Sequence, residues 1–195
     1  MQTVDHTAKR HKTREEQPGS ASQRKAAGVL HGAAVIEAIR ASGLSYVLSV
    51  PDLFTSSGLL VPLAQSNDPP LLRLSREDEG IGIASALSYC DKRALLLIQY
   101  TGFHDSVNAL RAVTLDYKLP LVMMIGLLGH DPEKAPRDSP RRGVRLVTPI
   151  LDALEIPYHA IHDDSHVGLI KPAIEGAYAT ATAVALLIAR KPVFP

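Results

Sequence analysis

The feature that most constrains the fold is a repeated alternation of short apolar runs with longer segments of helical periodicity. Four runs are largely apolar and rich in β-forming residues: Tyr46–Val50, Leu71–Leu74, Ala94–Ile98 and Leu121–Ile125. Helical spacing predicts helices between them, near Thr55–Gln65, Glu79–Cys90 and Ser106–Tyr117. Strands that alternate with helices indicate βαβ units around a mostly parallel sheet. Because the runs are continuously apolar, we expect helices on both faces of the sheet, which makes a three-layer α/β fold.

The remaining segments extend this pattern at both ends. A helix over Ala26–Ser42, stopped by Gly43, is expected before the first strand. After the fourth strand the sequence predicts, in order, an exposed loop over Gly129–Gly143, a helix over Leu146–Leu154, a strand over Tyr158–Ile161, a long alanine-rich helix over Leu169–Ala189, and a last strand at Val193 and Phe194. We expect a disordered polar tail over residues 1–28 and one folded domain over 29–195.

Charge and cysteine usage exclude several classes of protein. The formal net charge is +1, and basic residues exceed acidic ones only within residues 1–28, so the folded part has no basic surface for nucleic acid. Cys90 is the only cysteine, which rules out a disulfide within the chain and fits a reducing cytoplasm. The apolar runs are shorter than the roughly 20 residues that a membrane span needs. We therefore expect a cytoplasmic protein that binds neither nucleic acid nor a membrane.

Ligands of open parallel sheets bind beyond the carboxyl ends of the strands. This rule selects three segments: Pro51–Phe54, Ser75–Gly80 and Gln99–Asp105. In the second, Glu77, Asp78 and Glu79 start a helix. Acids in a first helical turn are each stabilised by about 0.3–1 kcal/mol through the helix dipole, so capping alone could account for them. The small residues that follow, up to Ala86, also let the helix approach a neighbour or a flat ligand closely.

At this point the sequence resembles a known family, the sulfopyruvate and phosphonopyruvate decarboxylases, which use thiamin diphosphate. The similarity covers about Gly32 to Val193 and matches the family's N-terminal pyrimidine-binding domain, as found in its alpha subunits. The segments that carry it are Gly43–Asp52, Glu77–Ala86, Leu95–Gly102, Ser106–Leu110 and Leu119–Val122. The resemblance implies the thiamin diphosphate-binding fold and a 2-oxo acid decarboxylase.

The resemblance implies roles for particular residues of this chain. Glu77 would be catalytic, its carboxyl group bonded to the pyrimidine nitrogen opposite the amino group of the cofactor. Glu79 is a second candidate for that role if the alignment is shifted by two positions. The cofactor-binding set would be Pro51, Asp52, Glu77, Gln99, Thr101 and Gly102. A glutamate with this role should be partly desolvated.

This chain also departs from the family pattern. Gln99-Tyr100-Thr101-Gly102 stands where the family has Gln-Asn-Ser-Gly, and Ala86 stands where it has glycine. His104 and Asp105 replace a small or glycine pair. His104 is a candidate catalytic proton donor or a clamp for an anionic substrate, because histidine titrates near neutral pH. An ordinary loop histidine is the alternative.

One half of the expected active site is missing from the sequence. Enzymes of this cofactor hold its diphosphate through Mg²⁺ bound by a Gly-Asp-Gly segment, and no such segment occurs here. Some members of the family are split into two chains. The resemblance therefore implies a hetero-oligomer in which a beta-type subunit with Gly-Asp-Gly holds most of the Mg²⁺ shell and completes the site for a small anionic 2-oxo acid.

Other signals support weaker hypotheses. The segment from His159 to His166 has the spacing of metal ligands, although an Asp-rich loop explains it better and we assign no metal ligand in this chain. Arg137, Arg141, Arg142 and Arg145 form a basic cluster that is either a solvated loop, a cover over the site or a docking patch. Two other functions remain open: a non-catalytic binding or regulatory module that keeps the fold, and a carboligase subunit.

Overall fold

A computed structural model describes residues 28–194. Its centre is a six-stranded sheet in which every neighbouring pair of strands is parallel, in the order β2-β1-β3-β4-β6-β5. The strands are β1 Tyr46–Ser49, β2 Leu71–Arg73, β3 Ala94–Gln99, β4 Leu121–Gly126, β5 Tyr158–Ile161 and β6 Ala183–Ile188. The four strands predicted first, and β5, lie where the sequence placed them.

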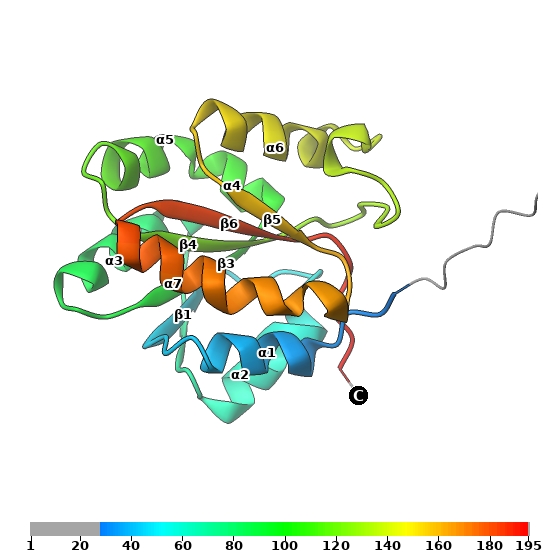
Figure 1. The fold of residues 1–195 in the computed structure, drawn as a ribbon, viewed down its shortest axis with the longest axis horizontal. Helices are drawn as coiled ribbons and strands as arrows, with labels where there is room; N and C mark the ends of the chain where they lie inside the picture. Colours follow the sequence, from blue (N-terminus) through cyan, green and yellow to red (C-terminus); the bar gives the residue numbers. More distant parts are fainter. Residues whose placement is uncertain (1–27, 195) are drawn as a thin grey trace, which may run out of the picture.

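Helices cover both faces of this sheet, as Figure 1 shows, with α1, α2 and α7 on one side and α4, α5 and α6 on the other. The helices are α1 Gly32–Arg40, η1 Ser56–Leu60 (a π-helix), α2 Val61–Ser66, α3 Glu77–Tyr89, α4 Tyr100–Asp105, α5 Val107–Ala109, η2 Leu110–Leu115 (also π), η3 Pro136–Asp138 (3₁₀), α6 Arg142–Ala153, η4 Asp164–Leu169 (3₁₀) and α7 Ile170–Thr180. The predicted three-layer α/β fold is confirmed.

Two separate cores follow from the alternation of side chains along each strand. In β3, Leu95 and Leu97 point into the core under α1, η1 and α7, whereas Leu96 and Ile98 point into the core under α3, α4 and α6. All four side chains are fully buried. Full burial of a leucine or isoleucine side chain contributes about 1.5–3 kcal/mol, so the continuous apolar run of a central strand stabilises both layers at once.

The predicted N-terminal helix begins later than the sequence indicated. Residues 26 and 27 lie outside the described part, and the helix starts at Gly32 rather than Ala26. The chain before it pairs with the C-terminal segment: Gly32 N donates to Val193 O at 2.7 Å, and Val193 N donates to Leu30 O at 2.9 Å. These bonds occupy backbone groups that a longer helix would need. The expected last strand is accordingly a single bridge between His31 and Val193. The predicted tail likewise falls on residues outside the described part, apart from Gly28.

The predicted long helix over Leu169–Ala189 is wrong in its second half. Helix α7 ends at Thr180, Ala181 adopts a left-handed conformation with φ 53°, and the chain then forms β6. Every residue of β6 is buried, and the strand pairs with β4 on one side and β5 on the other. Alanine and leucine favour helices intrinsically, but a central position in the sheet outweighs that preference.

Close packing of backbones fixes how α1 meets its neighbours. A Cβ atom at Gly32 would overlap the carbonyl of Gly58 in η1, and one at Gly58 would overlap the backbone of Pro192. Only glycine permits these two approaches.

None of the helices within residues 28–194 combines the length and the apolar character that a membrane span needs.

Candidate active site

The loop after β1 closes over the carboxyl edge of the sheet. Its Asp52 carboxylate accepts three hydrogen bonds: from Phe54 N at 2.5 Å, from Thr55 N at 2.8 Å and from the Thr55 hydroxyl at 2.5 Å. Aspartate caps turns and helix starts in this way. The predicted cofactor-binding carboxylate is therefore engaged by its own loop, while Pro51 beside it is exposed.

This loop reaches across the sheet to β4. A Cβ atom at Gly126, the last residue of β4, would lie 3.0 Å from the Phe54 ring and 3.2 Å from the Thr55 methyl group. Since β3 lies between β1 and β4, the loop passes above the end of β3. Gly126 was not among the predicted site residues. The rule that selected the other strand ends applies equally to β4 and would have found it.

The three acids that start α3 have separate partners. Asp78 forms an ion pair with Arg76, Oδ1 to Nε at 3.0 Å, and this arginine lowers the pKa of the Asp78 carboxyl group. Glu79 is exposed and its Oε2 accepts a hydrogen bond from Ser75 N at 3.1 Å, closing the start of the helix. The capping explanation therefore holds for Asp78 and Glu79.

Glu77 differs from both neighbours because its side chain turns inward. It is partly buried and lies against Gly102 of α4, where an added Cβ atom would overlap the Glu77 side chain. No hydrogen bond or ion pair to its carboxylate occurs among residues 28–194. The structure thus brings together two predicted site residues from the ends of β2 and β3. It also distinguishes Glu77 from the second candidate, Glu79, because the Glu79 carboxylate is hydrogen-bonded to Ser75 N at the start of the helix.

Gln99 and Thr101 lie at the same edge, where β3 passes into α4. The Thr101 hydroxyl donates to Gln99 Oε1 at 3.1 Å. Thr101 is exposed and Gln99 is partly buried. The segment from Gln99 to Asp105 lay outside the predicted helices, the next of which was expected at Ser106, but Tyr100–Asp105 is helix α4. Its residues therefore point in fixed directions around a helix axis.

His104 points away from Glu77. Residues two positions apart on a helix differ in direction by about 200°. The side of α4 that carries His104 is therefore nearly opposite the side of Gly102. His104 Nε2 lies 2.8 Å from the carbonyl oxygen of Gly143, and because a carbonyl only accepts, Nε2 carries the donated hydrogen. The Tyr100 ring lies on the same side and fills the space above Gly143.

Helix α4 consequently connects two parts of the molecule. Its Gly102 side contacts Glu77 at the start of α3, and its Tyr100 and His104 side contacts Gly143 at the start of α6. The two residues predicted to be catalytic, Glu77 and His104, therefore lie on opposite sides of α4. His104 is in position to hold α4 against α6.

We expect Gly102→Ala to displace the Glu77 carboxyl group without unfolding the protein. Alanine favours helices over glycine by about 0.5–1 kcal/mol, which offsets part of the cost of moving a flexible glutamate side chain. The expected result is a free energy of unfolding within about 1 kcal/mol of wild type, with a clear fall in any activity that depends on Glu77. Gly176→Ala, at an open position of α7, is the matched control and should leave activity unchanged. Equal activity of both variants would show that the position of Glu77 against Gly102 does not matter for activity.

Three of the four arginines of the cluster have a partner in the loop or in α6. Arg137 pairs with Asp152 at 2.5 Å, Arg141 Nε donates to Gly129 O at 3.1 Å, and Arg145 donates to Ser139 O at 3.1 Å. Among the described residues, Arg142 is the member without such a bond. Three of these arginines thus hold the segment from 129 to 143 in shape. For these three, the contacts favour the solvated-loop interpretation over a cover of the site or a docking patch.

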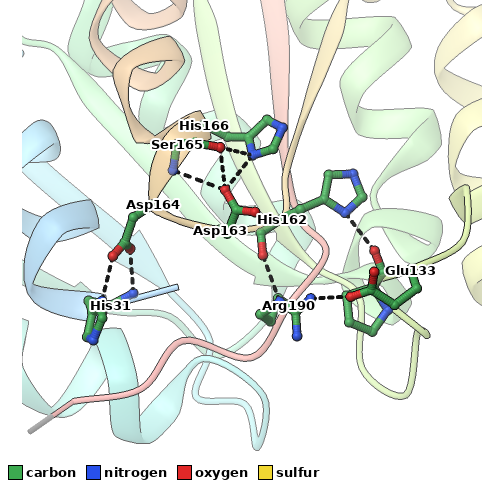
Figure 2. A network of polar contacts seen from close by, with 9 residues as sticks. His31, Glu133, His162, Asp163, Asp164, Ser165, His166 and Arg190 are labelled. Atoms are coloured by element: carbon green, nitrogen blue, oxygen red, sulfur yellow. Dashed lines mark hydrogen bonds and ion pairs between the residues drawn. The ribbon is translucent and has the colours of Figure 1, made fainter. Parts of the chain in front are cut away.

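A separate polar network occupies the carboxyl ends of β5 and β6 (Figure 2). Asp164 pairs with His31 Nδ1 at 2.5 Å, Asp163 accepts from Ser165 N and lies 3.0 Å from His166 Nδ1, and Arg190 donates to Glu133 at 2.6 Å. Within the described part of the chain, no group of three or more His, Cys, Asp or Glu side chains is arranged to hold a metal ion. His159 lies on β5, whereas His162 and His166 lie in the segment that follows this strand.

His130 should make stability depend on pH. It is 8% exposed and neither ring nitrogen has a hydrogen-bond partner among the described residues. Burial lowers its pKa below the ordinary 6.5, and the nearby His162 lowers it further. The unfolded chain therefore binds the proton more readily, and stability is lost as pH falls below about 6.5. We expect urea unfolding to show this loss between about pH 7 and 5, and His130→Leu to flatten it. An unchanged slope in the variant would contradict this explanation.

Taken together, the fold and the site define an α/β domain with an unpartnered glutamate at the carboxyl edge of a parallel sheet. No established protein-family model matches the chain. Comparison with curated proteins finds sulfopyruvate decarboxylase subunit alpha of Methanococcus maripaludis, 31% identical over 156 residues, or 80% of this chain and 92% of the relative. The protein of that name from Methanocaldococcus jannaschii is 27% identical over 79% of this chain and 90% of its own length.

A third relative differs in length. Sulfopyruvate decarboxylase of Methanosarcina acetivorans is 28% identical over 145 residues, which cover 74% of this chain but 36% of that protein. These matches establish the family. The chain belongs to the sulfopyruvate decarboxylase alpha-subunit family.

Proposed function

We propose that this chain is the alpha-type subunit of a thiamin-diphosphate-dependent 2-oxo acid decarboxylase. The observation that carries the proposal is the Glu77 carboxylate, which turns inward over Gly102 with no hydrogen-bond partner among residues 28–194. Membership of a family whose relatives are named sulfopyruvate decarboxylase subunit alpha supports the same function.

The residues at this edge fit an aminopyrimidine ring. A carboxyl group of this kind can share a proton with a ring nitrogen, and the missing side chain at Gly102 gives the Glu77 carboxyl group the space in which it lies. Gln99 and Thr101 add an amide and a hydroxyl group at the same edge. Asp52 would contribute differently, because its carboxylate already accepts three hydrogen bonds and instead fixes the shape of the loop that carries Pro51.

The division of labour follows from these positions. When bound, thiamin diphosphate would supply the electron sink that decarboxylation of a 2-oxo acid requires. Glu77 would orient the pyrimidine and hold a proton at its carboxyl oxygen, and Gly102, which has no side chain, would leave the space in which that carboxyl group lies. His104 would act indirectly, by holding α4 against Gly143 so that Gly102 keeps its place.

A second chain would complete the site. The sequence contains no Gly-Asp-Gly segment, and the described residues include no cluster of metal-ligand side chains. We infer that a beta-type subunit carries that segment and holds Mg²⁺ and the diphosphate. The name "subunit alpha" of two relatives supports a partner, and so does the longer Methanosarcina relative, most of which lies outside the matched part.

For the substrate we propose a small 2-oxo acid with a second anionic group. Sulfopyruvate is the first choice because of the names of the relatives, and phosphonopyruvate is the second because of the resemblance in sequence. A screen of 2-oxo acids for carbon dioxide release would decide between them.

The experiment that tests the proposal is exchange of the thiazolium C2 proton of thiamin diphosphate in deuterated water with Mg²⁺. It requires the chain purified together with the subunit that it binds natively. Exchange much faster than in free cofactor supports the proposal. Exchange at the rate of free cofactor, with a diphosphate-binding partner present, would contradict it.

Two alternatives are distinguished by the same preparation. The engagement of Asp52 and His104 in internal hydrogen bonds would suit a non-catalytic module, which would show no accelerated exchange. A carboligase would accelerate exchange but consume an aldehyde acceptor instead of releasing an aldehyde product. Product analysis therefore separates it from a decarboxylase.

A further inference from the structure

A cavity of about 340 Å³ lies beside the outer strand β2, on the face of the sheet opposite α3 and α4. Its floor is formed by Ser49 of β1 and by Leu71 and Arg73 of β2, and its wall by η1 and α2. Leu71 and Arg73 point to the same face because they are two residues apart in a strand. Leu60 from η1, which also lines the cavity, belongs to the core under α1, and Glu77 lies beyond the sheet from there.

The lining combines an apolar surface with uncommitted polar groups. The apolar side is formed by Pro51, Leu60, Val61, Ala64 and Leu71. The Ser56 hydroxyl, the Gln65 amide and the Arg73 guanidinium also line the cavity, and none of them has a side-chain hydrogen bond or ion pair among the described residues. Small-molecule sites typically have this composition and volumes of about 300–1,000 Å³.

The charge of the lining indicates what kind of ligand fits. Arg73 is the one cation that lines the cavity, and no acidic residue lines it. Most of the other arginines in the described part of the chain have an acidic or carbonyl partner, for example Arg111 with Asp116 at 2.8 Å. A guanidinium group without a protein partner, beside an apolar surface, suits a carboxylate or sulfonate.

We propose that this cavity binds a small organic acid through its anionic group at Arg73 and its apolar chain along Leu60, Val61 and Leu71. This site is separate from the proposed cofactor site because it lies on the opposite face of the sheet. It contacts that site through Pro51, which lines the cavity and precedes Asp52 in the loop that covers the end of β3. A ligand in the cavity therefore restrains this loop at Pro51.

The test is calorimetric titration of the full-length chain, with its native subunit, using hexane-1-sulfonate, hexanoate and hexan-1-ol as probes. The anions should bind at least tenfold more tightly than the alcohol. Hydrogen exchange followed by mass spectrometry should slow in residues 49–65 and 71–73 when either anion is added. Equal binding of the alcohol, or protection confined to other segments, would overturn the proposal.

Two substitutions locate the site without touching the proposed cofactor residues. Arg73→Met should weaken binding of both anions at least tenfold and leave the alcohol unaffected, while Ala64→Phe should fill the cavity and block all three probes. Arg111→Met is the matched control and should change nothing. Glu77→Gln should retain full binding, so failure here is distinguishable from failure of the proposed enzymatic function. Undiminished anion binding in both cavity variants would refute the site.

Discussion

Glu77→Gln is expected to slow exchange of the cofactor C2 proton by about a hundredfold or more, because positioned proton-transfer groups contribute about 10²–10⁴-fold. Glutamine keeps the size of the side chain and its position over Gly102 but cannot hold or release a proton. Since no hydrogen bond to the Glu77 carboxylate occurs among residues 28–194, the substitution removes no interaction that stabilises the fold. The melting temperature should therefore stay close to that of wild type.

Glu79→Gln is the control that separates chemistry from helix capping. Glu79 accepts a hydrogen bond from Ser75 N, which glutamine can also accept through its amide oxygen. We expect a loss of stability of less than about 1 kcal/mol and an exchange rate close to wild type. The reverse pattern, with Glu79→Gln inactive and Glu77→Gln active, would assign the role to the shifted alignment.

Phe103→Ala is expected to destabilise the protein by about 3–5 kcal/mol, the range found when a buried phenylalanine is truncated. Phe103 is fully buried in the core under α3, α4 and α6. Its side chain anchors α4 between Gly102, which contacts Glu77, and His104, which contacts Gly143. Because single domains are stable by only about 5–15 kcal/mol, the loss should be evident in urea or thermal unfolding.

Phe194→Ala is the matched control, since Phe194 is 48% exposed. Substitution of an exposed side chain away from special features usually changes stability by less than about 0.5 kcal/mol. A small effect at both positions would mean that α4 is not anchored by the core. A large effect at Phe103 should also lower the binding of any ligand that uses Gly102.

The sequence was most informative about short apolar runs that alternate with helical segments. Five of the six strands could be predicted from such runs, and two of them, β3 and β4, are buried on both faces, a pattern that a helix on each side of the sheet requires. The failure at Ala183–Ile188 has the same origin. Its alanines and leucines suit a helix equally well, and only pairing with β4 and β5, which is not local in the sequence, makes this segment a strand.

The candidate site was predictable in part. The rule for carboxyl strand ends selected the loop of Asp52, the start of α3 and the residues around Gln99, and the resemblance singled out Glu77. Directions of side chains could not be predicted, because they depend on whether Gln99–Asp105 is a loop or a helix. The contact of His104 with Gly143 joins residues that are 39 positions apart, and no local pattern indicates such a pair.

The two outer strands of the sheet limit how this chain can assemble with another. Strand β2 has three residues and ends at the exposed Arg73, and β5 has four and leads into the polar turn at Asp163 and Asp164. Short outer strands with charged ends resist strand-by-strand extension into a neighbouring chain. A partner subunit would therefore dock through loops and helices and would add no strand to the sheet. Its contacts would then lie at the carboxyl edge of the sheet and on the helical faces.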